Sequence, residues 1–195
     1  LWDREEKLLT LARDRVGEKP LYYGFQNRVF LFGSELKALK AHPDFLGEID
    51  RDVLCLYLRH CYIPAPYSIY KGIRKLLPGT YLQIDFGANA SSTQELIPKN
   101  YWSLANVAEQ GIKIPYEGSD ADAVLTLDRQ LKKAINLQMT ADVPLGAFLS
   151  GGVDSSAVVA LMQSQSMRPI KTFSIGFEES DYDETPYAKT VAQHL

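Results

Sequence analysis

The segment from Val143 to Phe177 limits the possible folds of this chain more than any other part of the sequence. A short apolar run, PLGAFL, is followed by SGGVDSS (residues 150–156), by a second apolar run, AVVALM, and by IKTFSIGF. This order predicts a strand, a loop, a helix and a second strand. Such a β-α-β unit requires a parallel strand pair joined by a right-handed crossover.

The SGGVDSS segment has the residue types of an anion-binding loop. Its two glycines let the backbone turn sharply and approach a ligand closely, and the start of the next helix supplies free N–H groups. The hydroxyls of Ser150, Ser155 and Ser156 add donors, so the segment suits phosphate. The carboxylate of Asp154 would repel phosphate unless a cation such as Mg²⁺ lies between them. The segment lacks the lysine of a Walker A loop, and a plain Gly-Gly turn with a helix cap is the alternative.

The residues before position 119 have a different pattern. Residues 7–13, 20–25 and 29–35 read as consecutive antiparallel strands, with a turn at Gly17 and a hairpin connection over residues 25–28. Residues 34–42 predict a helix capped by Ser34, and Asp50 or Asp52 predicts the cap of a second helix that ends near residue 61. Residues 75–86 predict a strand that follows the Pro78-Gly79 turn, and residues 87–100 predict a surface loop.

From residue 119 a long helix is expected, capped by Ser119 or Asp120, with apolar positions from Val124 to Met139. We therefore expect two structural units that divide between residues 105 and 119. The chain is 195 residues long, with 46% hydrophobic residues and a net charge of −3. This balance is typical of globular proteins and gives no indication of nucleic-acid binding. No apolar run reaches the roughly 18 residues of a membrane span.

The two cysteines, Cys55 and Cys61, do not have the spacing of a zinc site. We expect both to be small buried residues in a reducing compartment. A nucleophilic pair of Cys61 with its neighbour His60 is disfavoured, because adjacent residues point to different faces of a helix.

The sequence resembles a known family over most of its length. VPLGAFLSGGVDSSAVVALM and KTFSIGFEESDYDETPYAKTVA are similar to the synthetase domain of the glutamine-hydrolysing asparagine synthetases, whose SGGVDSS segment is a PP-loop. ARDRVGEKPLYYG, FGSELKAL and IPAPYSIYKGIRKLLPGTYL resemble the later strands of the glutaminase domain in that family and the stretch that leads out of it.

The resemblance implies a mixed fold, α/β together with α+β, of cytoplasmic location. Residues 1–110 would be the C-terminal part of an Ntn-type αββα glutamine amidotransferase domain with its connecting segment. Residues 111–195 would begin a parallel-sheet PP-loop synthetase domain. The family hydrolyses glutamine with a cysteine at the mature N-terminus and uses ATP and Mg²⁺ to convert aspartate into a β-aspartyl-AMP intermediate, which ammonia attacks. AMP and pyrophosphate are released.

The resemblance also assigns roles to individual residues. It implies pyrophosphate contacts from the SGGVDSS segment, ATP contact at Leu149, an adenine contact at Ile175, and Mg²⁺ at Asp154; the site residues are Leu149, Ser150, Gly151, Gly152, Asp154, Ser155, Ser156 and Ile175. Ile175 taken alone could equally be buried strand core. Asp181, Asp183 and Glu184 are interpreted as solvated residues before a helix with Thr185 as N-cap and Pro186 at N1. Arg13, Asp14, Arg15 and Glu35 are interpreted as structural.

The N-terminal nucleophile and the later synthetase helices have no counterpart in this sequence. We therefore expect a fragment of a longer enzyme that is inactive as a glutaminase and has no catalytic residue of its own. Its partners would be small molecules, namely aspartate, glutamine or ammonia, and ATP, without nucleic acid or membrane; a homodimer of the parent enzyme is compatible with this. The alternatives are a relative with another acyl substrate, such as a β-lactam synthetase or peptide-modifying amidotransferase, and a truncated, non-catalytic nucleotide-binding module.

Overall fold

A computed structural model describes residues 1–87 and 95–195 of the chain. The described residues form two compact units, Leu1–Pro115 and Tyr116–Leu195. Each unit has its own hydrophobic core.

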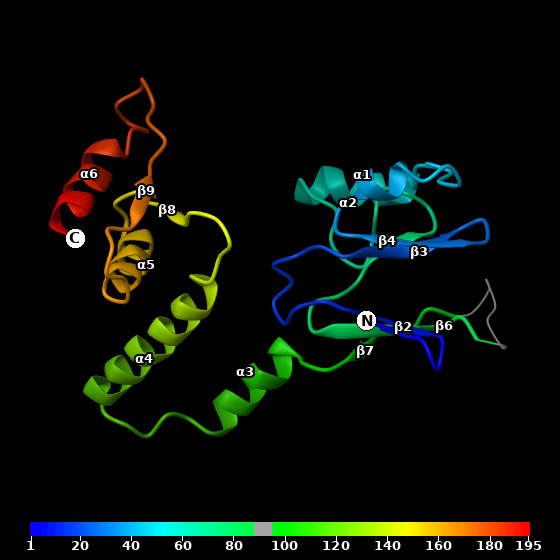
Figure 1. The fold of residues 1–195 in the computed structure, drawn as a ribbon, viewed down its shortest axis with the longest axis horizontal. Helices are drawn as coiled ribbons and strands as arrows, with labels where there is room; N and C mark the ends of the chain where they lie inside the picture. The colour runs from blue at the N-terminus through cyan, green and yellow to red at the C-terminus, as the bar shows by residue number, and fades with distance from the viewer. Residues whose placement is uncertain (88–94) are drawn as a thin grey trace. The chain divides into compact units, whose positions relative to one another are not determined.

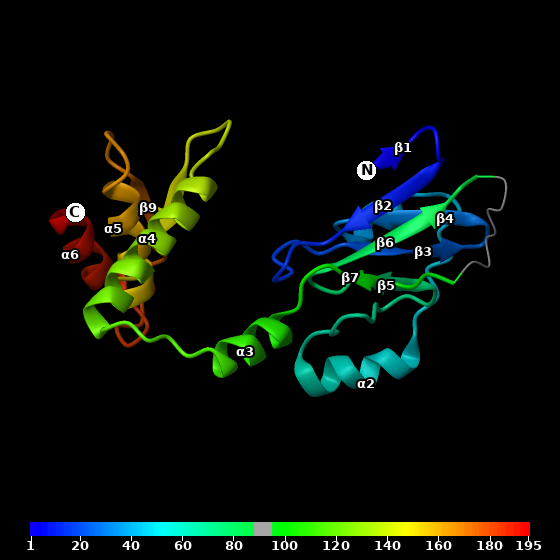
Figure 2. The same ribbon diagram turned by 90° about the horizontal axis from the view of Figure 1, so that it is seen from below.

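The first unit contains two antiparallel sheets (Figure 1). Strands β1 (Trp2–Asp3), β2 (Leu8–Ala12), β6 (Thr80–Asp85) and β7 (Lys99–Asn100) form one sheet in the order β1-β2-β6-β7. Strands β3 (Tyr22–Gln26), β4 (Val29–Gly33) and β5 (Ile73–Lys75) form the other in the order β4-β3-β5. Figure 2 shows β2 and β6 passing over β3 and β4 as two stacked layers.

The side chains between and beside these sheets alternate as the strand period requires. Tyr23 points into the core between the two sheets, where it packs with Leu11 and Leu82. Its neighbour Tyr22 packs on the opposite side with Leu39 of α1 (Leu36–Lys40). Figure 1 shows α1 and α2 (Arg51–His60) on the side of the three-stranded sheet that faces away from the other sheet.

The strand and helix predictions for this unit are partly correct. The hairpin of β3 and β4 is present with Asn27 and Arg28 at its turn, and Asp50 caps α2 by accepting from the N–H groups of Asp52 and Val53. The prediction that β2 and β3 are neighbouring antiparallel strands is wrong, because β2 pairs with β6 in the other sheet. The predicted Ser34 cap is also wrong, since Glu35 occupies the N-cap of α1.

Three further features of this unit differ from the expectation. The predicted loop over residues 87–100 includes 88–94, which lie outside the described residues, and its end forms β7 against β6. Helix α3 (Leu104–Lys113), which the sequence analysis did not identify, is capped by the hydroxyl of Ser103. Both cysteines, expected to be buried, are exposed on or next to α2, because that helix buries only Val53.

The second unit contains the predicted β-α-β element. It begins with α4 (Asp120–Gln138), where Ser119 and Asp122 form a capping box. Strands β8 (Gly146–Phe148) and β9 (Lys171–Phe173) pair in parallel, and α5 (Val153–Gln163) connects them. Helix α6 (Thr185–His194) follows a loop after β9. Leu149, Val159 and Ala188 form the core that joins β8, α5 and α6.

Among the described residues, no helix is both long and apolar enough to cross a membrane.

Candidate functional site

The residues between β8 and α5 form a glycine loop, defined here as residues 150–152. Leu149 precedes it, is buried, and extends the strand pair, because its N–H donates to the carbonyl of Phe173 at 2.9 Å. The hydroxyl of Ser174 donates to the Leu149 carbonyl at 2.6 Å. These bonds fix the point at which the glycine loop leaves the sheet. Such a loop lies at the carboxyl edge of the parallel strands, where ligands bind in α/β folds.

Gly151 adopts a backbone conformation that side chains rarely allow, with φ of +83°. A Cβ atom added there would lie 2.6 Å from the Cβ of Tyr187 and 2.7 Å from the N atom of Ala188. The backbone of the loop therefore packs directly on the first turn of α6. Gly152 is different, because its φ is −70° and an added Cβ would meet only the Ser150 hydroxyl, at 3.4 Å.

Ser150 of the glycine loop pairs with Ser155 in the first turn of α5. The hydroxyl oxygens of Ser150 and Ser155 are 2.9 Å apart, and the Ser155 hydroxyl lies 3.3 Å from the Gly152 carbonyl, to which it can donate. The N–H groups of Ser150 and Gly152 donate to these hydroxyls at 3.3 Å. Bonds of 3.3 Å are at the long end of the normal range and are weak. A ligand oxygen with better geometry can therefore replace the hydroxyls as acceptor.

The start of α5 supplies further donors. Gly152 is its N-cap, and among the described residues no side chain caps it. The N–H groups of the first helical turn lack intrahelical acceptors, so they are available to an anion at this helix end. Because α5 begins at Val153, Asp154 lies in its first turn rather than in the loop, and its side chain is exposed.

A polar cavity of about 610 Å³ lies beside the glycine loop. One wall is the loop, and the other is the segment that leads into α6. The lining residues are Ser150, Gly151, Gly152, Ser180, Asp181, Tyr182, Asp183, Glu184 and Tyr187.

A second, apolar cavity of about 260 Å³ adjoins the first. Ser150 and Glu184 line both cavities, so the two are neighbours. The apolar cavity is lined by Phe148, Leu149, Ser150, Phe173, Ser174, Ile175, Phe177 and Glu184. Ile175 lies two residues beyond the end of β9 and is 66% exposed, so the alternative that it is buried strand core is wrong.

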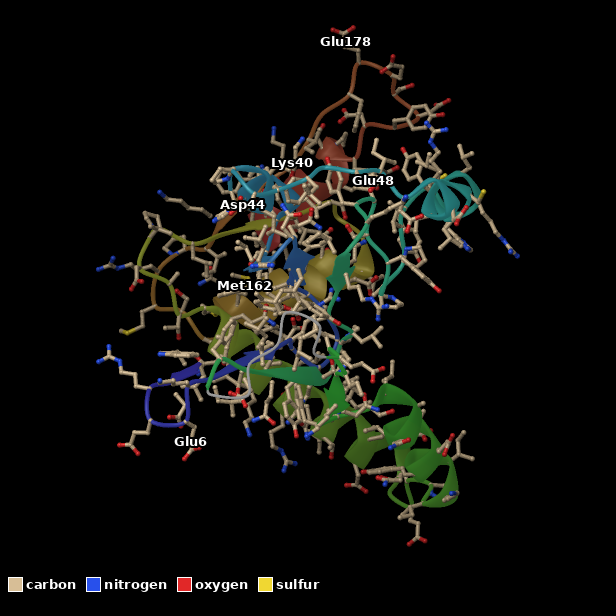
Figure 3. The ribbon with its side chains drawn as sticks, turned by 90° about the vertical axis from the view of Figure 1, so that its right-hand side faces the viewer. Glu6, Lys40, Asp44, Glu48, Met162 and Glu178 are labelled. Atoms are coloured by element: carbon tan, nitrogen blue, oxygen red, sulfur yellow. The ribbon has the colours of Figure 1, made fainter. Side chains whose placement is uncertain are left out.

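The acidic loop, residues 178–184, forms the rim opposite the glycine loop. Figure 3 labels Glu178 at the far end of this loop. The expected N-cap at Thr185 is wrong: Glu184 is the N-cap, and Pro186 is the second helical residue. The Thr185 hydroxyl instead donates to Asp183 Oδ1 at 2.6 Å, and its N–H donates to the same atom at 3.2 Å. The hydroxyl bond first, and then the N–H bond, lower the pKa of the Asp183 carboxyl below its ordinary value.

The predicted site residues are thus distributed over three places. The loop residues Ser150, Gly151 and Gly152 line the polar cavity, and Leu149 and Ile175 line the apolar one. Asp154, Ser155 and Ser156 line neither. Ser155 acts on the loop through Ser150. The Ser156 hydroxyl is buried and has no hydrogen-bond partner among the described residues.

Sequence reasoning missed the residues of the acidic loop and Tyr187 as cavity walls. The only local signal was the run of acidic and hydroxyl residues ESDYDET, which is equally typical of a solvated segment before a helix. Their position depends on the docking of α6 against Gly151, and a single sequence does not show that contact.

Arg13 and Asp14, which were expected to be structural, both bond to the backbone of the first unit. The Arg13 guanidinium donates to three backbone carbonyls, those of Lys19, Leu76 and Gly17, at 2.7–2.8 Å. Asp14 accepts from the N–H groups of Glu18 and Lys19. These bonds fix the turn around Gly17.

The lining of the two cavities is compatible with the parts of a nucleoside triphosphate. The uncapped start of α5, the Gly151 backbone and the Ser150 hydroxyl suit a polyphosphate, and the apolar cavity suits a flat base. No group of three or more metal-binding side chains occurs in residues 1–87 and 95–195. Mg²⁺ commonly needs only one or two carboxylates when substrate phosphates complete its coordination. Asp154 is therefore compatible with a cation only in the presence of the nucleotide.

Comparisons with known proteins agree with the two-part organisation. Residues 1–102 match a glutamine amidotransferase domain, and residues 126–195 match asparagine synthase. The chain therefore belongs to the glutamine-hydrolysing asparagine synthetase family.

Individual relatives cover the whole chain or nearly so. A putative asparagine synthetase 2 of Methanocaldococcus jannaschii is 36% identical over all of this chain, and asparagine synthetase 3 of Bacillus subtilis is 35% identical over 93% of it. The amidase chyE of Penicillium rubens is 30% identical over all of it. The chain spans only 28–36% of the length of these relatives.

Proposed function

We propose that this chain is part of an enzyme that makes asparagine from aspartate, with ammonia derived from glutamine and energy from ATP. The first unit would be the later part of an Ntn-type glutaminase domain, and the second would be the start of a PP-loop synthetase domain. The observation that carries the proposal is the glycine loop, which joins a polyphosphate-sized polar cavity to an apolar cavity at Ser150.

In the proposed chemistry, the aspartate side-chain carboxylate must first be given a better leaving group before ammonia can attack it. The aspartate side-chain carboxylate would attack the α-phosphorus of ATP, forming an acyl-adenylate and releasing pyrophosphate. Ammonia would then attack the acyl carbon and release AMP. The glycine loop and the start of α5 would hold the β- and γ-phosphates and stabilise the charge that develops as the Pα–O bond breaks. Bound Mg²⁺, held by Asp154 and the phosphates, would neutralise part of that charge.

The test is the identity of the phosphorus products. The full-length protein that contains this chain is incubated with ATP, Mg²⁺, aspartate and ammonia, and the mixture is followed by phosphorus NMR. We expect AMP and pyrophosphate as primary products. ADP and orthophosphate as primary products would disprove the proposed role of the glycine loop.

Asp154 provides a second, independent measurement. Asp154→Asn keeps the side-chain shape but removes the charge, so the apparent affinity for ATP should fall and should recover when Mg²⁺ is raised. Asp128→Asn, which removes a carboxylate from the Lys132 ion pair on α4, is the matched control and should show no such dependence. If the defect in ATP affinity of Asp154→Asn does not change with the Mg²⁺ concentration, Asp154 is not a cation ligand.

A second candidate is a related amidotransferase that activates another acyl substrate. The similarity to chyE favours it, because that relative is named as an amidase rather than as an asparagine synthetase. The same NMR experiment separates the two: a protein that forms AMP and pyrophosphate only with a carboxylic acid other than aspartate belongs to this second class.

A further inference from the structure

The first turn of α6 and the glycine loop are in backbone contact. The space where Gly151 would carry a Cβ is occupied by the Cβ of Tyr187 and by the N atom of Ala188, at 2.6 and 2.7 Å. The Ala188 N–H donates to the Glu184 carbonyl at 3.1 Å, so it is not free for a ligand. Pro186 has no N–H, and the Thr185 N–H is bonded to Asp183. The start of α6 is therefore a wall of the polar cavity and contributes few anion donors.

The position of that wall depends on how α6 begins. Glu184, its N-cap, makes no side-chain cap bond among the described residues, so the usual device for fixing a helix start is not used. Asp183 supplies the replacement, because its Oδ1 accepts from both the hydroxyl and the N–H of Thr185. The hydroxyl bond, at 2.6 Å, has an ionised acceptor and belongs to the stronger class of hydrogen bonds.

The same two residues contact the segment that leaves β9. A Cβ added to Gly176 would lie 3.4 Å from Thr185 Cγ2 and 3.7 Å from Asp183 Oδ1. The Phe177 N–H contributes to the lowered pKa of Asp183, after the two larger effects of the Thr185 hydroxyl and N–H. Gly176 lies between Ile175 and Phe177, which line the apolar cavity. Asp183 and Thr185 thus join the wall of the apolar cavity to the wall of the polar one.

We infer that the hydrogen-bonded pair of Asp183 and Thr185 is a positioning clasp, which sets the spacing between the two cavities and so the fit of the nucleotide across them. This inference rests on the proposed function, because it assumes that one nucleoside triphosphate spans both cavities. Neither residue takes part in the chemistry. The pair acts through α6 on Gly151 and through Gly176 on Ile175.

A cation-ligand role for Asp183 is the competing interpretation. One oxygen of Asp183 already accepts two hydrogen bonds from Thr185, which leaves that oxygen less available to a cation. The two roles make different predictions for removal of the Thr185 hydroxyl. If the pair is a clasp, the loss of the hydroxyl weakens ATP binding. If Asp183 is a cation ligand, the loss of the hydroxyl leaves more negative charge on its carboxylate and strengthens cation binding.

The test uses the full-length protein and the isosteric change Thr185→Val, which removes the hydroxyl and keeps the shape and the N–H. Thr190→Val is the matched control, because Thr190 lies on the same helix and its hydroxyl donates only to the Pro186 carbonyl, at 2.9 Å. Thr185→Ser restores the donor. Steady-state pyrophosphate release gives kcat and the KM values for ATP and aspartate, and thermal unfolding reports folding of each variant.

We expect Thr185→Val to raise the KM for ATP about 3- to 10-fold. This is less than the full effect of losing a hydrogen bond to a charged acceptor, because the part-buried bond acts on the nucleotide only through the cavity walls. The KM for aspartate should stay within about twofold, since aspartate does not bridge the cavities. Thr185→Ser should recover most of the ATP affinity, and Thr190→Val should resemble the wild type. A change in the KM for ATP without a change in the KM for aspartate distinguishes a clasp from a general loss of stability, which would alter the kinetics with both substrates.

The clasp is overturned if Thr185→Val and Thr190→Val have the same KM for ATP while the wild type still forms AMP and pyrophosphate. It is also overturned if Thr185→Val tightens ATP binding at limiting Mg²⁺, as the cation-ligand role predicts. If Thr185→Val does not fold, Thr185→Ser takes its place as the test. Because serine keeps the hydroxyl, an ATP affinity of Thr185→Ser below half the wild-type value would also overturn the clasp. Formation of ADP and orthophosphate by the wild type would instead refute the proposed function on which the clasp rests.

Discussion

Replacing each of the two adjacent glycines by alanine should have very different effects on stability. Gly151→Ala places a Cβ in the left-handed region at φ +83° and within 2.7 Å of the backbone of α6. The backbone strain costs about 1–2 kcal/mol. Overpacking against Tyr187 and Ala188 adds about 1–3 kcal/mol. We therefore expect the second unit to lose about 2–5 kcal/mol of unfolding free energy.

Gly152→Ala is the matched control within the same loop. Its φ of −70° suits any residue, and the added Cβ would contact only the Ser150 hydroxyl at 3.4 Å. Its effect on stability should be within about 1 kcal/mol, and reduced freedom of the unfolded chain can make it stabilising. Since Gly152 lines the polar cavity, its Cβ should instead weaken the binding of magnesium pyrophosphate.

The two units can be followed separately in urea. Both tryptophans, Trp2 and Trp102, belong to the first unit, so their fluorescence reports its unfolding, and far-UV circular dichroism reports both units. Gly151→Ala should lower the midpoint of the dichroism transition and leave the fluorescence transition unchanged. Calorimetric titration with magnesium pyrophosphate measures the effect of Gly152→Ala. The reasoning fails if Gly151→Ala costs less than about 0.5 kcal/mol, or if Gly152→Ala is equally destabilising.

Two further predictions concern the scaffold. Arg13→Ala removes three hydrogen bonds to carbonyls around the Gly17 turn and should destabilise the first unit by about 1.5–4 kcal/mol, measured by tryptophan fluorescence in urea; an unchanged midpoint would contradict the structural role of Arg13. The Ser119 hydroxyl, and then its N–H, lower the pKa of Asp122 below its ordinary value of 3.8. The stability that Asp122 contributes should therefore be complete above that value and be lost as the pH falls through the lower folded pKa. Ser119→Ala removes the hydroxyl but keeps the N–H, so it should weaken this dependence without abolishing it.

The β-α-β element could be predicted from the sequence because its signals are local. Apolar runs of strand length flank SGGVDSS, and the helical spacing of α5 and α4 follows directly. The sheets of the first unit could not be predicted in this way. Strand β2 pairs with β6, so that Leu11 lies opposite Leu82, and these two residues are far apart in the sequence. Hairpins such as β3 and β4 are detectable from a turn, whereas a pairing between distant strands leaves no local signal.

The missed elements have different reasons. Helix α3 was detectable in principle, because Ser103 precedes a run with helical spacing, LANVAEQGIK. It overlaps residues 105–119, where the division between the two units was expected, and so it was not predicted. The cysteines of α2 were expected to be buried from their residue type alone, but the helix contacts its unit mainly through Val53. At the site, the loop residues could be predicted from the motif. The opposite wall could not, because it depends on α6 packing against Gly151.

The start of α5 at Val153 changes the interpretation of Asp154. In the first turn of a helix, a carboxylate is favoured by the helix dipole, typically by 0.3–1 kcal/mol, whether or not a ligand is present. The same turn offers its N–H groups to an anion, so phosphate and Asp154 would compete for one positive helix end. A helix that served only to bind phosphate would be better with a neutral residue at this position. A carboxylate at position 154 is favourable in both states if it stabilises the helix start in the ligand-free protein and shares a cation with the phosphates when the nucleotide is bound. In that case Asp154→Asn should slightly destabilise the ligand-free protein, and only the ATP defect should depend on Mg²⁺.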